Sequence, residues 1–129
     1  MIVLPSAAKP NFLLKGSGGF FKGKDPNVPV AELENNWVEG TCVVYIGKAG
    51  GLNSSATLRK RLNQYMRFGS GEDVGHYGGR YIWQLKNHED LLVCYKELAG
   101  VEPEVVESAL ITSFKDKYAG KRPFANLTK

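Results

Sequence analysis

The sequence predicts a single domain of the α/β class, with an α+β arrangement, because strand-like apolar runs are interleaved with two amphipathic helical segments. Residues 41–47 and 91–95 are rich in Val, Ile, Leu and Tyr, which favour strands. Residues 54–68 and 103–118 carry apolar side chains at helical spacing. With 129 residues, of which 43% are hydrophobic, the chain can bury one core, so we expect residues 1–129 to form one domain. Residues 1–15 are expected to be an N-terminal extension that wraps the surface.

Composition narrows the class of partner. The 17 Lys and Arg residues against 13 Asp and Glu residues give a net charge of +4, which leans mildly towards a polyanionic partner. Cys42 and Cys94 each lie inside an apolar run, which predicts buried thiols, with no disulfide-linked partner and no zinc site. A reducing cytoplasm suits them. Pro5 and Pro10 interrupt the first apolar residues, no stretch approaches the roughly 20 apolar residues of a membrane span, and we therefore expect neither a signal peptide nor a membrane partner.

The run Val43-Val44-Tyr45-Ile46-Gly47-Lys48 changes character within six residues. Two strand formers, Val43 and Val44, lead to a tyrosine near the strand end, and Gly47 lets the backbone turn outward at Lys48. Such an arrangement can hold a phenol and an ammonium near one ligand. The alternative interpretation is an ordinary core strand whose tyrosine only packs.

A glycine-rich segment at residues 16–25 imitates a phosphate-binding loop but lacks its essential parts. Asp25 stands where such a loop needs Ser or Thr, and Pro26 and Pro29 prevent a helix from starting there. We therefore expect a short strand over residues 19–22 and then a loop. Residues 25–40 read as a polar connection with one helical turn over residues 31–35.

The first amphipathic segment is predicted to be a helix from Ser54 or Ser55, as N-cap, to Phe68, with Gly69 as its C-terminal stop. Arg61 lies one turn before Tyr65, so the two share a face. The expected apolar stripe consists of Leu58, Leu62, Tyr65 and Met66.

The following segment, residues 69–79, is too rich in glycine for regular structure and is expected to be a loop. Its His76 could act as an acid, a base or a phosphate contact, or could only order the loop. Residues 80–85 fit either a strand or a short helix, and residues 91–95 are predicted to be a buried strand.

The last helix is predicted to start at Pro103 and to run to about Tyr118, with Gly120 after its end. Glu107 falls on the apolar side of this helix. An ionised carboxylate there is costly unless cations or donors meet it, so Glu107 either forms a structural ion pair, for example with Arg61, or serves a function.

The order of these features resembles the GIY-YIG nuclease domain over roughly Gly18 to Leu127. The resemblance rests on Gly19-Phe20-Phe21, Tyr45-Ile46-Gly47-Lys48, Arg61 on the next helix, Glu107 on the last helix, and Pro123-Phe124-Ala125-Asn126. It implies a small mixed three-stranded β-sheet flanked by helices, and it favours the helical interpretation of residues 80–85. It also implies hydrolysis of DNA phosphodiester bonds with one divalent metal, Mg²⁺ or Mn²⁺.

The resemblance further assigns roles to single residues. Tyr45 would help to generate the attacking water or hydroxide, Arg61 would contact the scissile phosphate, and Glu107 would be the sole protein carboxylate on the metal. Lys48 matches a lysine that follows the motif in some relatives, and it would either favour the phenolate of Tyr45 or bind phosphate. Tyr65 falls where relatives carry His or Tyr, and Asn126 would support the site. At the first motif the resemblance places Phe21 where relatives have a tyrosine, so one phenol is absent.

Six basic residues are candidates for tracking a DNA backbone, although scattered basic residues are usually just solvated. They are Lys22, Lys24, Arg59, Lys60, Arg67 and Arg80. The preferred hypothesis is thus a metal-dependent DNA endonuclease, and the alternatives are an inactive nucleic-acid-binding module on the same scaffold or a protein-interaction domain. Since the sequence carries no second domain, the choice of a DNA site would come from DNA structure, from loops such as residues 69–79, or from a protein partner.

Overall fold

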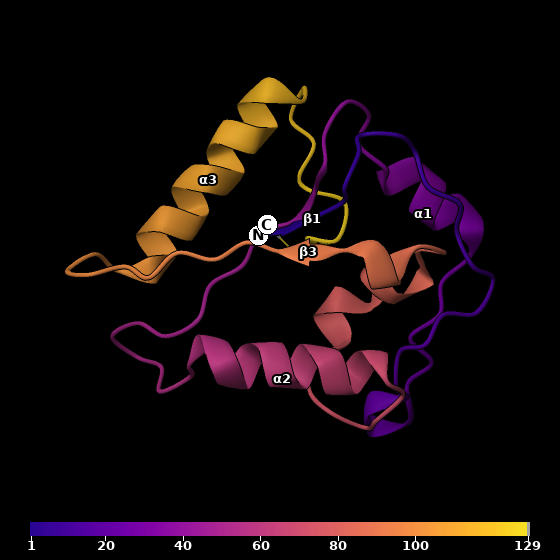
Figure 1. The fold of residues 1–129 in the computed structure, drawn as a ribbon, viewed down its shortest axis with the longest axis horizontal. Helices are drawn as coiled ribbons and strands as arrows, with labels where there is room; N and C mark the ends of the chain where they lie inside the picture. Colours follow the sequence, from indigo (N-terminus) through magenta and orange to yellow (C-terminus); the bar gives the residue numbers. More distant parts are fainter. Residues whose placement is uncertain (129) are drawn as a thin grey trace.

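The computed structural model describes residues 1–128, apart from the side chain of Tyr77, as an α+β fold built around a three-stranded antiparallel sheet (Figure 1). Two of the predicted strands, over residues 41–47 and 91–95, and both long helices are present, although the strands are shorter. In chain order the elements are β1 (Ile2–Val3), the 3₁₀ helix η1 (Phe21–Gly23), α1 (Val30–Asn36), β2 (Val43–Tyr45), α2 (Leu58–Gly69), the 3₁₀ helices η2 (Tyr77–Gln84) and η3 (His88–Asp90), β3 (Leu92–Val93) and α3 (Pro103–Lys117).

The central strand comes from the start of the chain. The strand order is β2-β1-β3, with Ile2 opposite Tyr45 on one side and opposite Val93 on the other. Ile2 and Leu4 are buried, so the expectation that residues 1–15 only wrap the surface is wrong. The expected mixed sheet is also wrong for the described residues, because both pairs of neighbouring strands are antiparallel.

Helices cover the sheet on both faces, and in Figure 1 α3 and α2 lie on opposite sides of the strands. The larger core joins Ile2 and Val44 to Phe68 of α2, to Leu33 of α1 and to Ile82 of η2. The smaller core packs two residues of α3, Ile111 and Phe114, against Val38 and Ile46. The sheet is thus the middle layer of three.

The two edges of the sheet differ. The C-terminal tail covers β2, where the Ala125 amide donates to the Val44 carbonyl at 2.8 Å. The outer edge of β3 is solvent-exposed: Leu92 is 55% exposed and Cys94 is exposed. The prediction that residues 91–95 form a buried strand, with Cys94 as a core thiol, is therefore wrong, because this apolar run lies at an edge of the sheet.

Residues 16–25 form no strand. They pack against the end of α2 instead, where the Gly19 amide donates to the Phe68 carbonyl at 2.9 Å and the Lys22 amide donates to Asp73 Oδ1 at 3.0 Å. Gly19 lies so close to the Glu72 carbonyl that a Cβ atom would clash with it. Phe21 therefore lies in η1, not in a strand beside β2.

Helix α2 starts later than predicted because the hydroxyl group of Ser54 forms a turn before the helix, while that of Thr57 caps it. Ser54 Oγ accepts from the Ala56 amide at 3.2 Å, which makes a local turn. Thr57 Oγ1 accepts from the Lys60 amide at 3.1 Å and is the N-cap. At the other end the left-handed residue is Gly71, with φ of 89°, while Gly69 is still helical and leaves room for the Trp83 ring.

Residues 80–84 are helical as part of η2, whereas Leu85 follows the helix and forms an isolated antiparallel bridge with Phe12. Gln84 connects the N-terminal region to the core. The Gln84 amide group donates to the carbonyls of Leu13 and Val28 and accepts from the Val28 amide, at 2.8–3.0 Å. The helical turn predicted over residues 31–35 is confirmed as α1. No helix of residues 1–128 is both long enough and apolar enough to cross a membrane.

Candidate functional site

Two adjoining hollows, with volumes of about 220 Å³ and 240 Å³, form an open cleft at the end of β2. Arg61 and Glu107 line both hollows, so they lie where the two meet. We call the first hollow the tyrosine side and the second the lysine side of the cleft. The tyrosine side also includes Tyr45, His76 and Asn126, and the lysine side includes Lys48, Gly50 and Ser54.

Tyr45 ends β2, and its ring lies over the backbone of Gly47. A Cβ atom at position 47 would fall 2.6 Å from Tyr45 Cε1 and 2.8 Å from its hydroxyl oxygen. Tyr45 is half-buried: it packs against the larger core and also lines the cleft. Any side chain at position 47 would displace the phenol ring, so Gly47 keeps the Tyr45 ring in its place.

Asn126 fixes the backbone beside Tyr45. Its side chain accepts from the Ile46 amide at 2.9 Å and donates to the Ile46 carbonyl at 2.8 Å, both in buried positions. The side-chain amide of Asn126 thus joins the C-terminal tail to the end of β2 through two hydrogen bonds, which we call the Asn126 clamp. Asn126 lines the cleft, and these bonds occupy one donor and one acceptor of its side chain.

Helix α2 brings Arg61 into the cleft and places Tyr65 in the core. Arg61 is half-buried in the first turn after the Thr57 cap. Tyr65 is 4% exposed and packs on the rings of Trp83 and His76. Burial, followed by the neighbouring Tyr45, raises the pKa of Tyr65 well above its ordinary value. Tyr65 lines neither hollow and packs against His76 instead. Its position therefore does not support the assignment of Tyr65 as a catalytic residue.

The apolar stripe predicted for α2 is only partly correct. Its buried residues are Tyr65 and Phe68, whereas Leu58 and Met66 are exposed. The stripe is shifted because η2, with Trp83, packs against the Tyr65 side of the helix.

His76 lines the tyrosine side of the cleft. It lies in the glycine-rich loop, stacks edge-on against Tyr65 at 5.3 Å, and its Nδ1 atom is buried without a hydrogen-bond partner among the described residues. Burial, followed by the positive charge of Arg61, lowers the pKa of His76. A neutral imidazole at pH 7 can accept a proton or a hydrogen bond.

Glu107 comes from α3, where it shares a stripe with Ile111 and Phe114, the two buried residues of that helix. The prediction that it projects from the apolar side is confirmed. Because Glu107 is one turn before the packed residues, its half-buried carboxyl group reaches the cleft instead of the core. Within residues 1–128 no group of three or more His, Cys, Asp or Glu side chains is placed to hold a metal.

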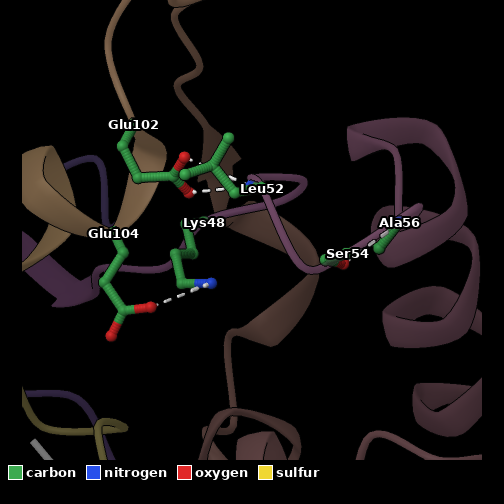
Figure 2. A network of polar contacts seen from close by, with 6 residues as sticks. All are labelled: Lys48, Leu52, Ser54, Ala56, Glu102 and Glu104. Carbon is green, nitrogen blue, oxygen red and sulfur yellow. Dashed lines mark hydrogen bonds and ion pairs between the residues drawn. The ribbon is translucent and has the colours of Figure 1, made fainter.

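Lys48 reaches only the lysine side of the cleft. Its Nζ atom lies 3.8 Å from Glu104 Oε2, as Figure 2 shows, and this pair is partly exposed to solvent. The neighbouring Glu102 accepts from the Leu52 amide through both carboxylate oxygens, at 3.2 and 3.3 Å. The start of α3 thus holds the loop that follows β2. Glu102 and Glu104 were not predicted from the sequence, although two acidic residues beside Pro103 are a typical sign of a helix start.

The six basic residues proposed for DNA binding are not gathered at the cleft, and none of them lines either hollow. Arg59 and Lys60 are exposed beside Arg61 at the start of α2. Lys22 and Lys24 are exposed in and after η1, next to the other end of α2. Arg67 pairs with Glu72 at 3.1 Å, and the Arg80 guanidinium lies 5.5 Å from the Tyr81 ring.

Comparisons of this chain with protein-family models, with curated proteins and with solved structures found no match. The fold and the cleft therefore define the class of the molecule: an α+β domain with an open cleft that combines a phenol, a guanidinium, an imidazole and a carboxylate.

Proposed function

We propose that this protein is a divalent-metal-dependent DNA endonuclease whose site resembles that of the GIY-YIG nucleases. One observation carries the proposal: Tyr45, Arg61 and Glu107 come from three different elements and line one open cleft. Hydrolysis of a phosphodiester needs an activated water, positive charge on the phosphate oxygens, and a ligand for a metal. The three side chains match these needs.

A divalent metal fits the chemistry of the cleft. Glu107 is the carboxylate that would hold it, because this side chain lines both halves of the cleft. Mg²⁺ commonly uses one or two carboxylates and fills the rest of its shell with water and substrate phosphate oxygens. Bound there, Mg²⁺ or Mn²⁺ would supply positive charge at the scissile phosphate and favour the ionised form of a bound water.

The remaining side chains have distinct tasks in this proposal. Arg61 binds two phosphate oxygens through its planar guanidinium group. Arg61, which lines the same cleft, favours the phenolate form of Tyr45, which takes a proton from the attacking water as the water oxygen bonds to phosphorus. The P–O bond to the leaving oxygen then breaks, and that oxygen takes a proton from solvent water. His76, which is neutral at pH 7, is placed to accept a hydrogen bond from the substrate or a proton on the tyrosine side. Lys48 would bind the neighbouring phosphate on the lysine side.

The basic residues give the path of the DNA strand. Helix α2 has 12 residues, which corresponds to a length of about 18 Å and to about five nucleotides along one strand. Arg59 and Lys60 near the start of α2 and Lys22 and Lys24 near its other end would therefore contact phosphates along the length of this helix.

The test is cleavage of nicked, branched, single-stranded and supercoiled DNA with Mg²⁺ or Mn²⁺. Glu107→Gln is expected to reduce cleavage by at least about a hundredfold, because the metal loses its protein ligand. Asp116→Asn is the matched control, since Asp116 is an exposed acidic residue on the same helix, and it should retain wild-type activity. Absence of cleavage for every DNA form, or a fully active Glu107→Gln variant, would refute the proposal.

The second candidate is a nucleic-acid-binding module without activity, and one observation favours it. Phe21, which stands at the first-motif tyrosine position of the resemblance, lies in η1, and the residue opposite Tyr45 on the central strand is Ile2, so neither position supplies a second phenol. The binding module predicts salt-dependent DNA binding that needs no metal and survives Glu107→Gln.

The proposal places the protein in the cytoplasm, where the free thiols of Cys42 and Cys94 remain reduced. A protein partner would supply preference for a particular DNA sequence.

A further inference from the structure

We propose that the C-terminal end of α3 and the turn after it form a second surface for the backbone of the DNA substrate. DNA is the partner here because of the proposed function, on which this inference rests, but the surface concerns binding and not cleavage. We call it the α3 basic surface, and its residues are Lys115, Lys117, Lys121 and Arg122.

The positive charge of the chain is concentrated in this one segment. Residues 115–122 contain four basic residues and one acidic residue, Asp116, and so carry a net charge of +3. The whole chain has a net charge of +4, so all other residues together carry only +1. Most of the net attraction for a polyanion therefore comes from this end of α3.

The backbone after α3 gathers the basic side chains in one place. Ala119 and Gly120 both have left-handed conformations, with φ of 54° and 81°, and the Gly120 amide donates to the Lys115 carbonyl at 2.8 Å. The Lys121 amide donates to the Tyr118 carbonyl at 3.0 Å. The chain thus turns back on the last turn of the helix, which places Lys121 next to it.

Neither capping nor ion pairing accounts for all these charges. A helix C-terminus favours cations in its last turn, where Lys115 and Lys117 lie, but backbone amides already bond carbonyls of that turn, and Arg122 lies beyond the helix. Lys117 Nζ lies 5.7 Å from the Tyr118 ring. Within residues 1–128 none of the four basic side chains forms an ion pair, and Lys117, Lys121 and Arg122 are exposed. Their charges are therefore available to an external anion.

The α3 basic surface is continuous with the cleft through the C-terminal tail. Arg122 starts this tail, which runs back to the middle of the molecule (Figure 1), and residues 125–128 line the tyrosine side. Burial and a hydrogen bond to Glu32 raise the pKa of Tyr81 to about 12, while the nearby charges of Arg80 and Arg122 act in the opposite direction. Arg80 and Arg122 thus lie near the same hydroxyl group, which extends the positive charge from the end of α3 towards η2.

The α3 basic surface is within reach of DNA bound in the cleft. Lys117 lies ten residues after Glu107 on the same helix, which corresponds to about 15 Å and to about four nucleotides along one strand. Helices α2 and α3 lie on opposite sides of the strands in Figure 1. The basic residues along α2 and the α3 basic surface would therefore contact different parts of the DNA that flank the cleft.

The experiment measures binding of a labelled DNA duplex by fluorescence anisotropy, without metal and at several salt concentrations. The test variant replaces three exposed residues of the surface, as Lys117→Gln, Lys121→Gln and Arg122→Gln. The control variant removes the same charge from exposed residues elsewhere, as Lys15→Gln, Lys86→Gln and Lys96→Gln. The test variant should bind at least about tenfold more weakly, and the slope of log affinity against log salt should shrink by about two to three, since each lost phosphate contact contributes about 0.9. The control variant should stay within about threefold of the wild type.

Equal weakening in the two triple variants would overturn the proposed surface, because the effect would then come from net charge alone. A wild type that fails to bind DNA at low salt would overturn it as well, whether or not it binds vesicles that contain phosphatidylserine instead. A protein that binds DNA through these residues but never cleaves it keeps the surface and refutes the nuclease proposal. A nuclease whose two triple variants bind DNA equally well keeps the activity and refutes the surface.

Discussion

Single residues decide what the cleft can do, and Gly47 is the most constrained of them. The Tyr45 ring occupies the space where a Cβ atom of residue 47 would lie. Gly47 does not have a left-handed backbone conformation, so alanine fits its backbone without strain. Its absence of a side chain therefore serves the orientation of the tyrosine.

Gly47→Ala is expected to push the Tyr45 ring out of its place in the cleft. Under the proposed function, DNA cleavage should fall at least about tenfold, as for Tyr45→Phe, while the melting temperature changes by only a few degrees. Gly78→Ala is the matched control: Gly78 lines the same hollow, but a Cβ atom there would meet nothing. Equal activity of wild type and Gly47→Ala would show that ring orientation does not limit the reaction.

For single residues, the sequence predicted which kinds of side chain line the cleft better than it predicted which of them are buried. Tyr45, Arg61 and Glu107 were predicted from strand-end and helix-face positions, and all three line the cleft. Tyr65 shares a helix face with Arg61 and was assigned to the site by the resemblance, yet Trp83 and His76 pack against it. Which of two neighbours on one face reaches solvent depends on the segment packed against them, and helical spacing carries no information about that segment.

Among the elements, the C-terminal tail has the clearest structural task, because it completes the edge of β2. Asn126 and Ala125 together make three hydrogen bonds to the Val44–Ile46 stretch. The tail therefore hydrogen-bonds along the edge of β2 as a neighbouring strand would, although it is not a strand itself. These bonds fix the backbone on either side of Tyr45.

Asn126→Ala should lower the free energy of unfolding by about 2–4 kcal/mol, because it leaves the buried N–H and C=O groups of Ile46 without partners. Chemical denaturation would measure this loss. Asn63→Ala, at an exposed position of α2, is the control and should change stability by less than about 0.5 kcal/mol. A similarly small effect at Asn126 would mean that water replaces the clamp.

The elements also show where local sequence patterns stop being informative. The helices α2 and α3 and the strand β2 were predicted because their periodicity, caps and composition are local properties. Strand β1 was missed because it has only two residues, Ile2 and Val3, and its identity comes from partners far along the chain. Strand β3 was found but wrongly buried, since an apolar run has the same composition in the middle of a sheet as at an edge.

For the molecule as a whole, His76 couples stability to pH. Its pKa is below the ordinary value of 6.5 in the folded protein because of burial and Arg61. Below about pH 6.5 the unfolded chain therefore binds more protons than the folded one, and unfolding becomes more favourable as the pH falls.

Acidification below pH 6.5 should thus lower the free energy of unfolding, by up to about 1.4 kcal/mol per pH unit from this one group. Denaturation between pH 7 and pH 5 would measure the slope. His76→Gln should flatten the curve in this range, whereas His88→Gln, which removes the other histidine, should retain it. A slope that is the same in all three proteins would assign the acid sensitivity to carboxyl groups.

The position of β1 in the middle of the sheet also constrains the order in which the chain folds. Met1 pairs with Cys94, which is 93 positions away, and the tail seals β2 through Asn126, which is 80 positions from Ile46. Such distant pairings pay a large loop-closure entropy before they gain contacts, and they slow folding. During synthesis the first strand leaves the ribosome long before its neighbours, so the sheet closes only when nearly all of these residues have been made, and the exposed apolar start of the chain must stay unpaired until then.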